Sequence, residues 1–329
     1  MEYRRLGRSG LQLSVLSFGS WVTFARQVDE GSARSLMALA YEHGVNFFDN
    51  AEAYEKGASE ALMGKSLRAL AWPRDSYCVS SKVFWGGEKP TQRGLSRKHV
   101  HDACHAALRR LQVDYLDLYF CHRPDIDTPI DETVRAMHDL VTQGKVLYWG
   151  TSEWSAQQIT EAQAVARANF LTPPTMEQPE YNLFNRKKLE REYLPLFRDY
   201  GMGTTTFCPL ANGVLTGKYN QGIPDGSRMS LPGYEWLRGR LENEAGRQML
   251  AKTVELQKLA DEAGLPLHHM ALLWCLANPN VSSLILGASK ISQLEDNLGA
   301  LGNADKVTAG LLEKIEQIVD NKPKLETRF

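Results

Sequence analysis

The sequence predicts a (β/α)8 barrel, an α/β fold in which eight parallel strands alternate with helices. Eight short β-branched or aromatic runs alternate with amphipathic stretches along the 329 residues. Seven of them begin about 30 residues apart, the length of a strand with a crossover helix leading to the next parallel strand. We expect the sheet to close into a barrel, because a closed sheet has no edge strand with unpaired backbone N–H and C=O groups. The alternative, a doubly wound open sheet, is disfavoured because no G-x-G-x-x-G motif follows an early strand.

Two short strands, Tyr3–Leu6 and Gln12–Val15, flank a Ser9–Gly10 turn and predict a hairpin that plugs the barrel floor. The eight barrel strands are expected at Leu16–Gly19, Val45–Asp49, Tyr77–Lys82, Tyr115–Cys121, Val146–Ser152, Thr175–Gln178, Gly203–Phe207 and Val281–Leu286. We expect one domain covering residues 1–329.

Helices between the strands carry recognisable signals. Lys98–Leu111 places its apolar residues on one stripe. Thr128–Pro129 predicts an N-cap followed by a proline in the first turn, and Gly144 suits the position after that helix ends. Ser155 and Gln158 fit a capping box.

The interval between the seventh and eighth strands departs from the repeat. It contains a Gly-, Pro- and Ser-rich stretch, Pro209–Gly239, followed by helical sequence. Loops of this length inside a compact domain usually carry function.

Composition excludes several classes of protein. The formal net charge is −1 and the isoelectric point is about 6.7, which argues against nucleic acid or an anionic membrane as the main partner. The longest apolar run, Met270–Ala277, is far shorter than the ~20 residues of a membrane span, and the N-terminus lacks a signal-peptide core. Five cysteines without a C-x-x-C pair indicate reduced thiols. We expect a cytoplasmic protein without membrane insertion.

Polar residues gather where the predicted strands end, the edge that carries the active site in α/β barrels. They are Asp49, Lys82, His122, Ser152 and Gln178, and the eighth strand continues through Gly287 to Ser289. Tyr54 adds an acid to this set. A tyrosine has a pKa of ~10, but a nearby lysine stabilises the tyrosinate and a carboxylate keeps that lysine charged and oriented. His122 can hydrogen-bond a substrate carbonyl.

A metal site is not expected. His99, His101 and His105 lie on an outer helix, and His268–His269 begin another helix, where surface or packing roles are the ordinary ones. Trp85 either lines the substrate pocket or packs under a loop.

The sequence resembles the aldo-keto reductases. The segments FFDNAEAYEKG, SSKVFWGG and LYFCHRPD carry the resemblance, and LSFGSWVTF, EQPEYNLF, PLANGVLTGKY and ILGAS extend it over nearly the whole chain. It is closest to the branch that contains voltage-gated potassium channel β-subunits and their plant and bacterial relatives. The resemblance implies reduction of small aldehydes or ketones by NADPH. Tyr54 is then the general acid, Lys82 and Asp49 tune it, and His122 orients the carbonyl.

The resemblance also implies a site for NADPH or NADP+ across the barrel mouth. At the nicotinamide end it names Ser20, Trp21, Gln27, Asp49, Ser152, Glu153, Gln178 and Phe207. For the phosphates it names Cys208, Pro209, Leu210, Ala211, Asn212, Lys218 and Arg228. For the adenosine end it names Gly287, Ser289, Gln293, Asp296 and Asn297.

Some of these positions differ from their counterparts in the family. Phe207 stands where channel β-subunits have Trp, Cys208 where the family usually has Ser, and Glu153 where animal subunits have Arg. The nearby Lys and Arg side chains predict that Cys208 is the thiol most sensitive to oxidation when the cofactor is absent.

Two rival functions stay open. The first is a regulatory subunit that binds NADPH and docks on a cation channel with slow turnover; the second is a metal-dependent barrel hydrolase. His122 favours an enzyme, since animal channel subunits tend to carry Asn there, and so does a sequence that opens at the hairpin without a pore-blocking extension. A homotetramer is implied by the resemblance alone.

Overall fold

The computed structural model describes residues 1–325, which form two compact units. The first, called the barrel unit here, comprises Met1–Pro179, Glu192–Phe207 and Asn280–Glu295. The second unit comprises Glu180–Arg191, Cys208–Pro279 and residues 296–325. The expectation of one domain stays a prediction, and each unit is described by itself.

The barrel unit contains a closed barrel of eight parallel strands in the order β10-β3-β4-β5-β6-β7-β8-β9. The strands are β3 (Leu16–Gly19), β4 (Phe47–Asp49), β5 (Cys78–Val83), β6 (Leu116–Cys121), β7 (Val146–Thr151), β8 (Met176–Glu177), β9 (Gly203–Thr206) and β10 (Ser283–Leu286). The predicted (β/α)8 barrel is confirmed, and the open sheet is wrong, because β10 pairs with both β3 and β9.

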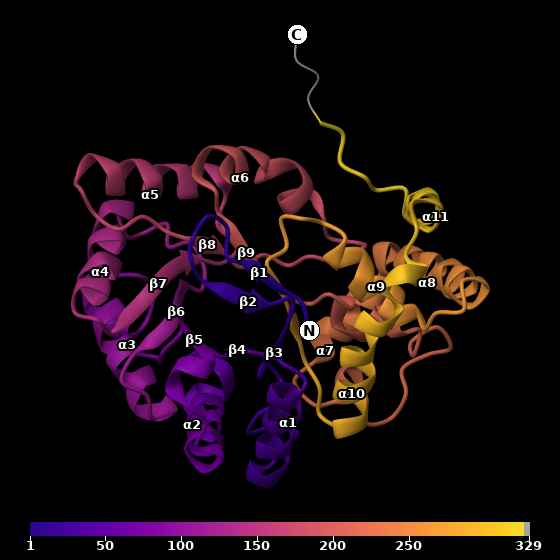
Figure 1. The fold of residues 1–329 in the computed structure, drawn as a ribbon, viewed down its shortest axis with the longest axis horizontal. Coiled ribbons are helices and arrows are strands. Elements are labelled where there is room, and N and C mark those ends of the chain that lie inside the picture. Colours follow the sequence, from indigo (N-terminus) through magenta and orange to yellow (C-terminus); the bar gives the residue numbers. More distant parts are fainter. Residues whose placement is uncertain (326–329) are drawn as a thin grey trace. The chain divides into compact units, whose positions relative to one another are not determined.

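Helices surround these strands on the outside (Figure 1). They are α1 (Glu30–Glu42), α2 (Ala58–Leu70), α3 (Arg97–Leu111), α4 (Ile130–Thr142), α5 (Ala156–Ala168) and α6 (Leu194–Tyr200), with the short 3-10 turns η1 (Tyr54–Gly57), η2 (Arg74–Ser76) and η3 (Pro90–Gln92). The Ser155–Gln158 capping box of α5 is present, and Gly144 follows α4 with φ of +67°. Thr128 is not the N-cap of α4. The cap is Pro129, because the Thr128 hydroxyl instead donates to Asp125 Oδ2 at 2.7 Å.

The N-terminal hairpin closes one end of the barrel, as predicted. Its strands are β1 (Tyr3–Arg5) and β2 (Gln12–Ser14), paired antiparallel. Leu6 and Leu13 from the hairpin are fully buried in a cluster with barrel residues that include Phe47 and Leu118. This end lies at the amino ends of the strands, since the backbone N–H of Arg8 donates to the Gly201 carbonyl just before β9.

The second unit is mostly helical. Its helices are α7 (Glu235–Glu242), α8 (Glu244–Glu262), α9 (Leu267–Leu276) and α11 (Ala309–Val319), with 3-10 segments η5 (Ala211–Thr216), η6 (Arg228–Ser230) and η7 (Ala300–Lys306). The π-turn η4 (Lys188–Glu192) and helix α10 (Ile291–Gly299) contribute residues to both units. Within residues 1–325, no helix combines the length and apolarity needed to cross a membrane.

Candidate active site

The predicted polar residues of the barrel unit lie at the carboxyl ends of its strands. Asp49 is the last residue of β4, and Lys82 is the penultimate residue of β5. The residues directly after β3, β6, β7, β8, β9 and β10 are Ser20, His122, Ser152, Gln178, Phe207 and Gly287. Because the strands are parallel, their carboxyl ends share one rim.

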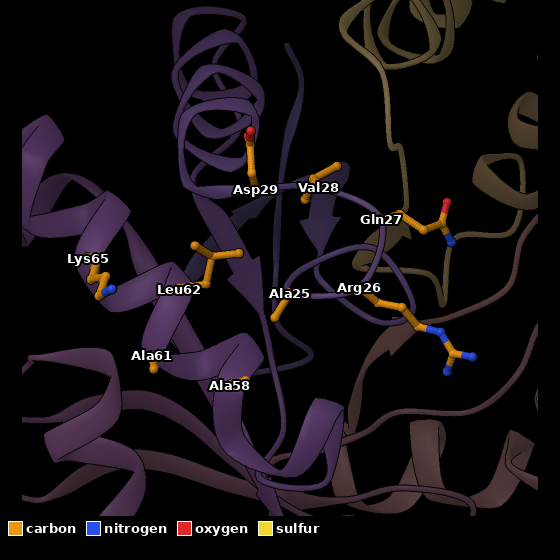
Figure 2. Close-up of a pocket in the computed structure, with 9 residues that line it drawn as sticks. All are labelled: Ala25, Arg26, Gln27, Val28, Asp29, Ala58, Ala61, Leu62 and Lys65. Atoms are coloured by element: carbon orange, nitrogen blue, oxygen red, sulfur yellow. The ribbon is translucent and has the colours of Figure 1, made fainter.

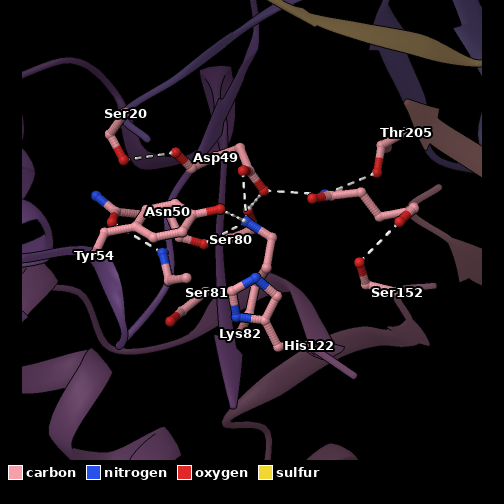
Figure 3. Close-up of polar contacts among 12 residues, drawn as sticks. Ser20, Asp49, Asn50, Tyr54, Ser80, Ser81, Lys82, His122, Ser152 and Thr205 are labelled. Carbon is pink, nitrogen blue, oxygen red and sulfur yellow. Dashed lines mark hydrogen bonds and ion pairs between the residues drawn. The ribbon is translucent and has the colours of Figure 1, made fainter. Parts of the chain in front are cut away.

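Lys82 is the centre of a buried hydrogen-bonded group (Figure 3). Its Nζ donates to Asp49 Oδ2 at 2.5 Å, to the Asn50 carbonyl at 2.8 Å and to the Tyr54 hydroxyl oxygen at 3.1 Å. An ammonium group has three donors and no acceptor, so these contacts use all of them. The Tyr54 hydroxyl proton therefore cannot be shared with Lys82 and is directed to another partner.

Burial sets the electrostatics of this group. Lys82 and Asp49 are 1% and 3% exposed. Burial lowers the pKa of Lys82, and the Asp49 carboxylate opposes that change. A buried ammonium without its carboxylate would lose its proton or destabilise the fold, so Asp49 keeps Lys82 charged.

The turn that presents Tyr54 is strained. Glu55 and Lys56 have φ of +48° and +54°, a left-handed conformation that costs non-glycine residues energy. Gly57 follows with φ of +87°, where its missing Cβ leaves room for the Arg110 side chain. Such strain is found where a side chain must be held in one place, here the hydroxyl beside Lys82.

His122 is a neutral ring at the same rim. Burial lowers its pKa well below the usual value, and the charges of Lys82 and Arg123 lower it further. Its ring makes edge contacts with Tyr54 (5.8 Å between centroids) and Trp85 (5.0 Å). Its Nδ1 is buried without a hydrogen-bond partner among residues 1–325. A polar atom left in this way points to a ligand, because burying it unpaired costs free energy.

The residues expected around a nicotinamide contact the same group. Gln178 Nε2 donates to Asp49 Oδ1 and to Thr205 Oγ1, both at 3.2 Å. Ser152 Oγ donates to the Gln178 carbonyl at 2.8 Å, and Ser20 Oγ donates to the Asp49 carbonyl at 3.1 Å. A carboxamide both donates and accepts hydrogen bonds, and these amide and hydroxyl groups can do the same in return.

Other predicted cofactor residues of the barrel unit make contacts of their own or differ in backbone conformation and exposure. Ser289 contacts Gln293 through its hydroxyl and its backbone N–H, each directed to Oε1, at 3.3 and 3.1 Å. Gln27 donates to the Val22 carbonyl at 3.0 Å, and Glu153 has φ of +61°. Trp21 is partly exposed.

Gln27 also lines a pocket of about 550 Å³ (Figure 2). The pocket is formed by the segment between β3 and α1 and by the first part of α2: Ala25, Arg26, Gln27, Val28, Asp29, Ala58, Ala61, Leu62 and Lys65. None of the four candidate catalytic residues lines it.

In the second unit the expected phosphate residues gather around Asn212. Its Oδ1 lies 3.4 Å from Cys208 Sγ and 3.5 Å from Arg228 Nη1. The segment from Cys208 to Gly213, which also contains Pro209 and Leu210, includes four residues with positive φ: Cys208, Ala211, Asn212 and Gly213. Partial burial and the neighbouring Arg228 together lower the pKa of Lys218. Two cations held near a strained loop suit an anion such as a phosphate.

The surroundings of Cys208 bear on its expected oxidation. Burial and the nearby Glu180 carboxylate raise the pKa of Cys208 to about 12, which disfavours the thiolate form, and its sensitivity to oxidation stays a prediction.

The residues expected at the adenosine end, Asp296 and Asn297, belong to the second unit. Asp296 Oδ2 lies 2.7 Å from His268 Nε2, and Asp296 Oδ1 lies 3.2 Å from His269 Nε2. These three side chains form a group that could hold a metal ion, whereas sequence reasoning assigned the two histidines surface or packing roles. His269 Nε2 is also 2.7 Å from the Asp296 carbonyl, so this nitrogen already has a contact within the protein, as expected for a packing role.

Sequence reasoning missed the support behind the candidate catalytic group. The Ser80 hydroxyl donates to Asp49 Oδ1 at 2.8 Å. Ser80 precedes Lys82 by two residues on β5 and therefore faces the same side, a signal that the sequence offered. Glu52 is 5% exposed and accepts from the Phe84 backbone N–H at 2.7 Å, and its Oε1 lies 3.4 Å from His99 Nε2. This buried pair braces the loop that carries Trp85.

The Glu52–His99 pair predicts a pH-dependent stability. Burial alone lowers the pKa of His99, but the hydrogen bond and charge of Glu52 outweigh it and the pKa is raised. The contribution of this pair to the free energy of unfolding is therefore fully present below the unfolded-state pKa of His99. It is lost as the pH rises through the folded-state pKa of His99. We expect the melting temperature of the wild type to exceed that of His99→Gln most at low pH, with the gap closing at higher pH. His101→Gln, on the exposed side of α3, is the control and should show no such trend; a gap independent of pH would contradict the assignment.

Comparison with known proteins assigns the family. The aldo/keto reductase family profile matches residues 15–320, so the chain belongs to the aldo/keto reductase family, an oxidoreductase family that generally uses NAD(P)H. Two curated plant proteins, one from Arabidopsis thaliana and one from Oryza sativa subsp. japonica, are each 50% identical to the chain over 325 and 329 residues, with 98% of both chains covered. Both are named "Probable voltage-gated potassium channel subunit beta". The resemblance drawn from the sequence motifs is confirmed.

Proposed function

We propose that the protein is an NADPH-dependent reductase of small aldehydes and ketones. The observation that carries the proposal is the buried group in which Lys82 Nζ contacts both Asp49 Oδ2, at 2.5 Å, and the Tyr54 hydroxyl oxygen, at 3.1 Å. A cation beside a phenol oxygen stabilises the charge that forms when the proton leaves, which makes the phenol an effective acid near neutral pH.

The roles of the chain's own residues follow from this arrangement. NADPH, when bound, supplies the hydride that reaches the carbonyl carbon. Tyr54 gives its proton to the carbonyl oxygen, Lys82 stabilises the tyrosinate left behind, and Asp49 holds Lys82 charged. Neutral His122 donates a hydrogen bond to the same oxygen and fixes its position. The product is the alcohol, and Tyr54 regains its proton from solvent.

The cofactor contacts belong to the same proposal. Ser152 and Gln178 hold the carboxamide of the nicotinamide, with Ser20, Trp21, Gln27, Glu153 and Phe207 around the ring. The loop from Cys208 to Asn212, with Lys218 and Arg228, binds the phosphates. Gly287, Ser289, Gln293, Asp296 and Asn297 hold the adenosine end. The two neighbouring cations, Lys218 and Arg228, support this assignment because they suit a phosphate.

The proposal predicts a cofactor preference. Each charge-assisted contact to the 2′-phosphate contributes ~1.5–3 kcal/mol, so NADPH should bind at least about tenfold more tightly than NADH. Fluorescence titration measures both affinities. Arg228→Met should narrow the difference, and Lys258→Met, which removes a lysine paired with Glu255 on α8, should leave it unchanged. Equal affinities of the wild type for the two cofactors would overturn the assignment of the phosphate site.

Turnover tests the proposed activity itself. Purified protein is mixed with NADPH and a panel of small aldehydes and ketones, and cofactor oxidation and alcohol formation are both measured. For at least one carbonyl compound, we expect the amount of alcohol formed to equal the amount of NADPH oxidised. Absence of turnover across the panel, with NADPH bound, would reject the reductase.

A second candidate function rests on the names of the relatives. Both plant proteins that are 50% identical to this chain are named as probable subunits of a voltage-gated potassium channel. We propose as the alternative that this chain binds such a channel with slow turnover. Copurification with a tagged channel, compared with a tagged unrelated membrane protein, tests it.

We also propose a homotetramer and a cytoplasmic location. Light scattering measures the oligomeric state, and cell fractionation measures the location.

A further inference from the structure

Arg123 follows His122 at the rim of the barrel and has no role in the chemistry proposed so far. Its Nη1 donates to the His122 carbonyl at 2.5 Å and to Ser152 Oγ at 3.3 Å. A guanidinium carries five N–H donors in a planar fork. Within residues 1–325, Nε and Nη2 make no hydrogen bond, so much of the fork is available to a ligand.

Arg123 is also without a counter-ion among the described residues. The carboxylate nearest in sequence, Asp125, accepts from the Leu95 N–H and the Thr128 hydroxyl, each at 2.7 Å. Asp49 is paired with Lys82. Asp49 is thus engaged by Lys82 and Asp125 by Leu95 and Thr128, and neither forms an ion pair with Arg123.

Trp85 contacts both Arg123 and His122. The guanidinium carbon is 5.5 Å from the centre of the Trp85 ring, and the centre of the His122 ring is 5.0 Å from it. Trp85 is 38% exposed, so its ring offers an apolar wall to a ligand at the rim. A carbonyl compound held by His122 would contact this ring, which Arg123 also contacts.

We propose that the substrate is an anionic carbonyl compound, an aldehyde or ketone whose carboxylate is bound by Arg123 while its carbonyl is held by His122. This inference rests on the proposed reductase function. The carboxylate takes no part in the step: the carbonyl carbon gains hydride from NADPH, the oxygen gains the Tyr54 proton, and NADP+ leaves. Arg123 acts as a specificity-determining residue through a charge-assisted, bidentate contact.

The test compares two substrates of nearly equal shape, 4-formylbenzoate and 4-formylbenzamide, with NADPH. We expect the wild type to show a kcat/KM for the carboxylate at least about tenfold above that for the amide, since hydrogen bonds to a charged group discriminate by that much. The preference should fall as salt is raised, because the attraction is electrostatic. Arg123→Gln should bring the ratio of the two kcat/KM values near one, and Arg123→Lys should restore part of it.

The ratio separates binding of the carboxylate from a structural role of Arg123. If Arg123 acted only through its contacts to His122 and Ser152, its loss would lower kcat/KM for both substrates by the same factor. The ratio of the two kcat/KM values would then stay unchanged, and that result would overturn the proposal. Arg198→Gln, which removes an exposed arginine paired with Asp199, is the control and should keep the wild-type ratio. NADPH affinity, measured on each variant, shows that it is folded and loaded. Reduction of the amide without preference for the carboxylate would reject the inference and keep the reductase, whereas reduction of neither compound would count against the reductase itself.

Discussion

Tyr54→Phe is expected to lose at least ~10²-fold in kcat, the lower end for removal of one general acid, while NADPH affinity stays within a few-fold. The substitution removes a single oxygen, the one that accepts from Lys82 Nζ at 3.1 Å. The strained turn at Glu55 and Lys56 depends on the backbone and should hold the ring where it is. Steady-state kinetics with an aldehyde and fluorescence titration of NADPH measure the two quantities.

A matched control is available on the same unit. Tyr41 donates its hydroxyl to Ser76 Oγ at 2.9 Å, outside the catalytic group. Tyr41→Phe should therefore keep kcat near the wild-type value. A similar loss in both variants would show that kcat responds to tyrosine hydroxyls in general and would contradict the specific role of Tyr54.

Lys82→Met is expected to lower kcat by a comparable factor and to destabilise the fold. Without the ammonium, the tyrosinate formed in the reaction has no nearby cation. Breaking a buried ion pair also leaves Asp49 as an uncompensated charge, which costs ~3–5 kcal/mol of unfolding free energy. Urea unfolding measures the second effect, and turnover at a temperature where the variant is folded measures the first.

The double variant Lys82→Met with Asp49→Asn separates the two effects. It removes the uncompensated charge, so we expect stability to recover in part while kcat stays low. Lys98→Met is the surface control: its pair with Asp102 is more than half exposed, and its loss should cost less than ~1 kcal/mol. Recovery of turnover in the double variant would contradict the role of the lysine.

Much of the fold follows from local sequence because each strand and helix repeats one pattern. The regular spacing of the strands requires parallel neighbours, and closure then brings the carboxyl ends to one rim, where Asp49, Lys82 and His122 were expected. Strand limits shifted by one or two residues in several places, as at β10, which begins at Ser283 instead of Val281.

Other features depend on distances that no local pattern contains. The lack of a counter-ion at Arg123 depends on where Asp125 finds its partners, and the Glu52–His99 pair joins segments far apart in sequence. Thr128 carries an N-cap pattern, yet its hydroxyl goes to Asp125 because the preceding turn brings that carboxylate closer. The division into two units likewise depends on tertiary contacts.

The most direct test of the central claim is a single-turnover measurement of hydride transfer with NADPH already bound and an aldehyde in excess. This reports the chemical step without product release. The account predicts rapid oxidation of the bound cofactor by the wild type and a rate at least ~10²-fold lower in Tyr54→Phe. Hydride transfer in Tyr54→Phe at near the wild-type rate would contradict the assignment of Tyr54 as the acid and would make His122 the candidate in its place.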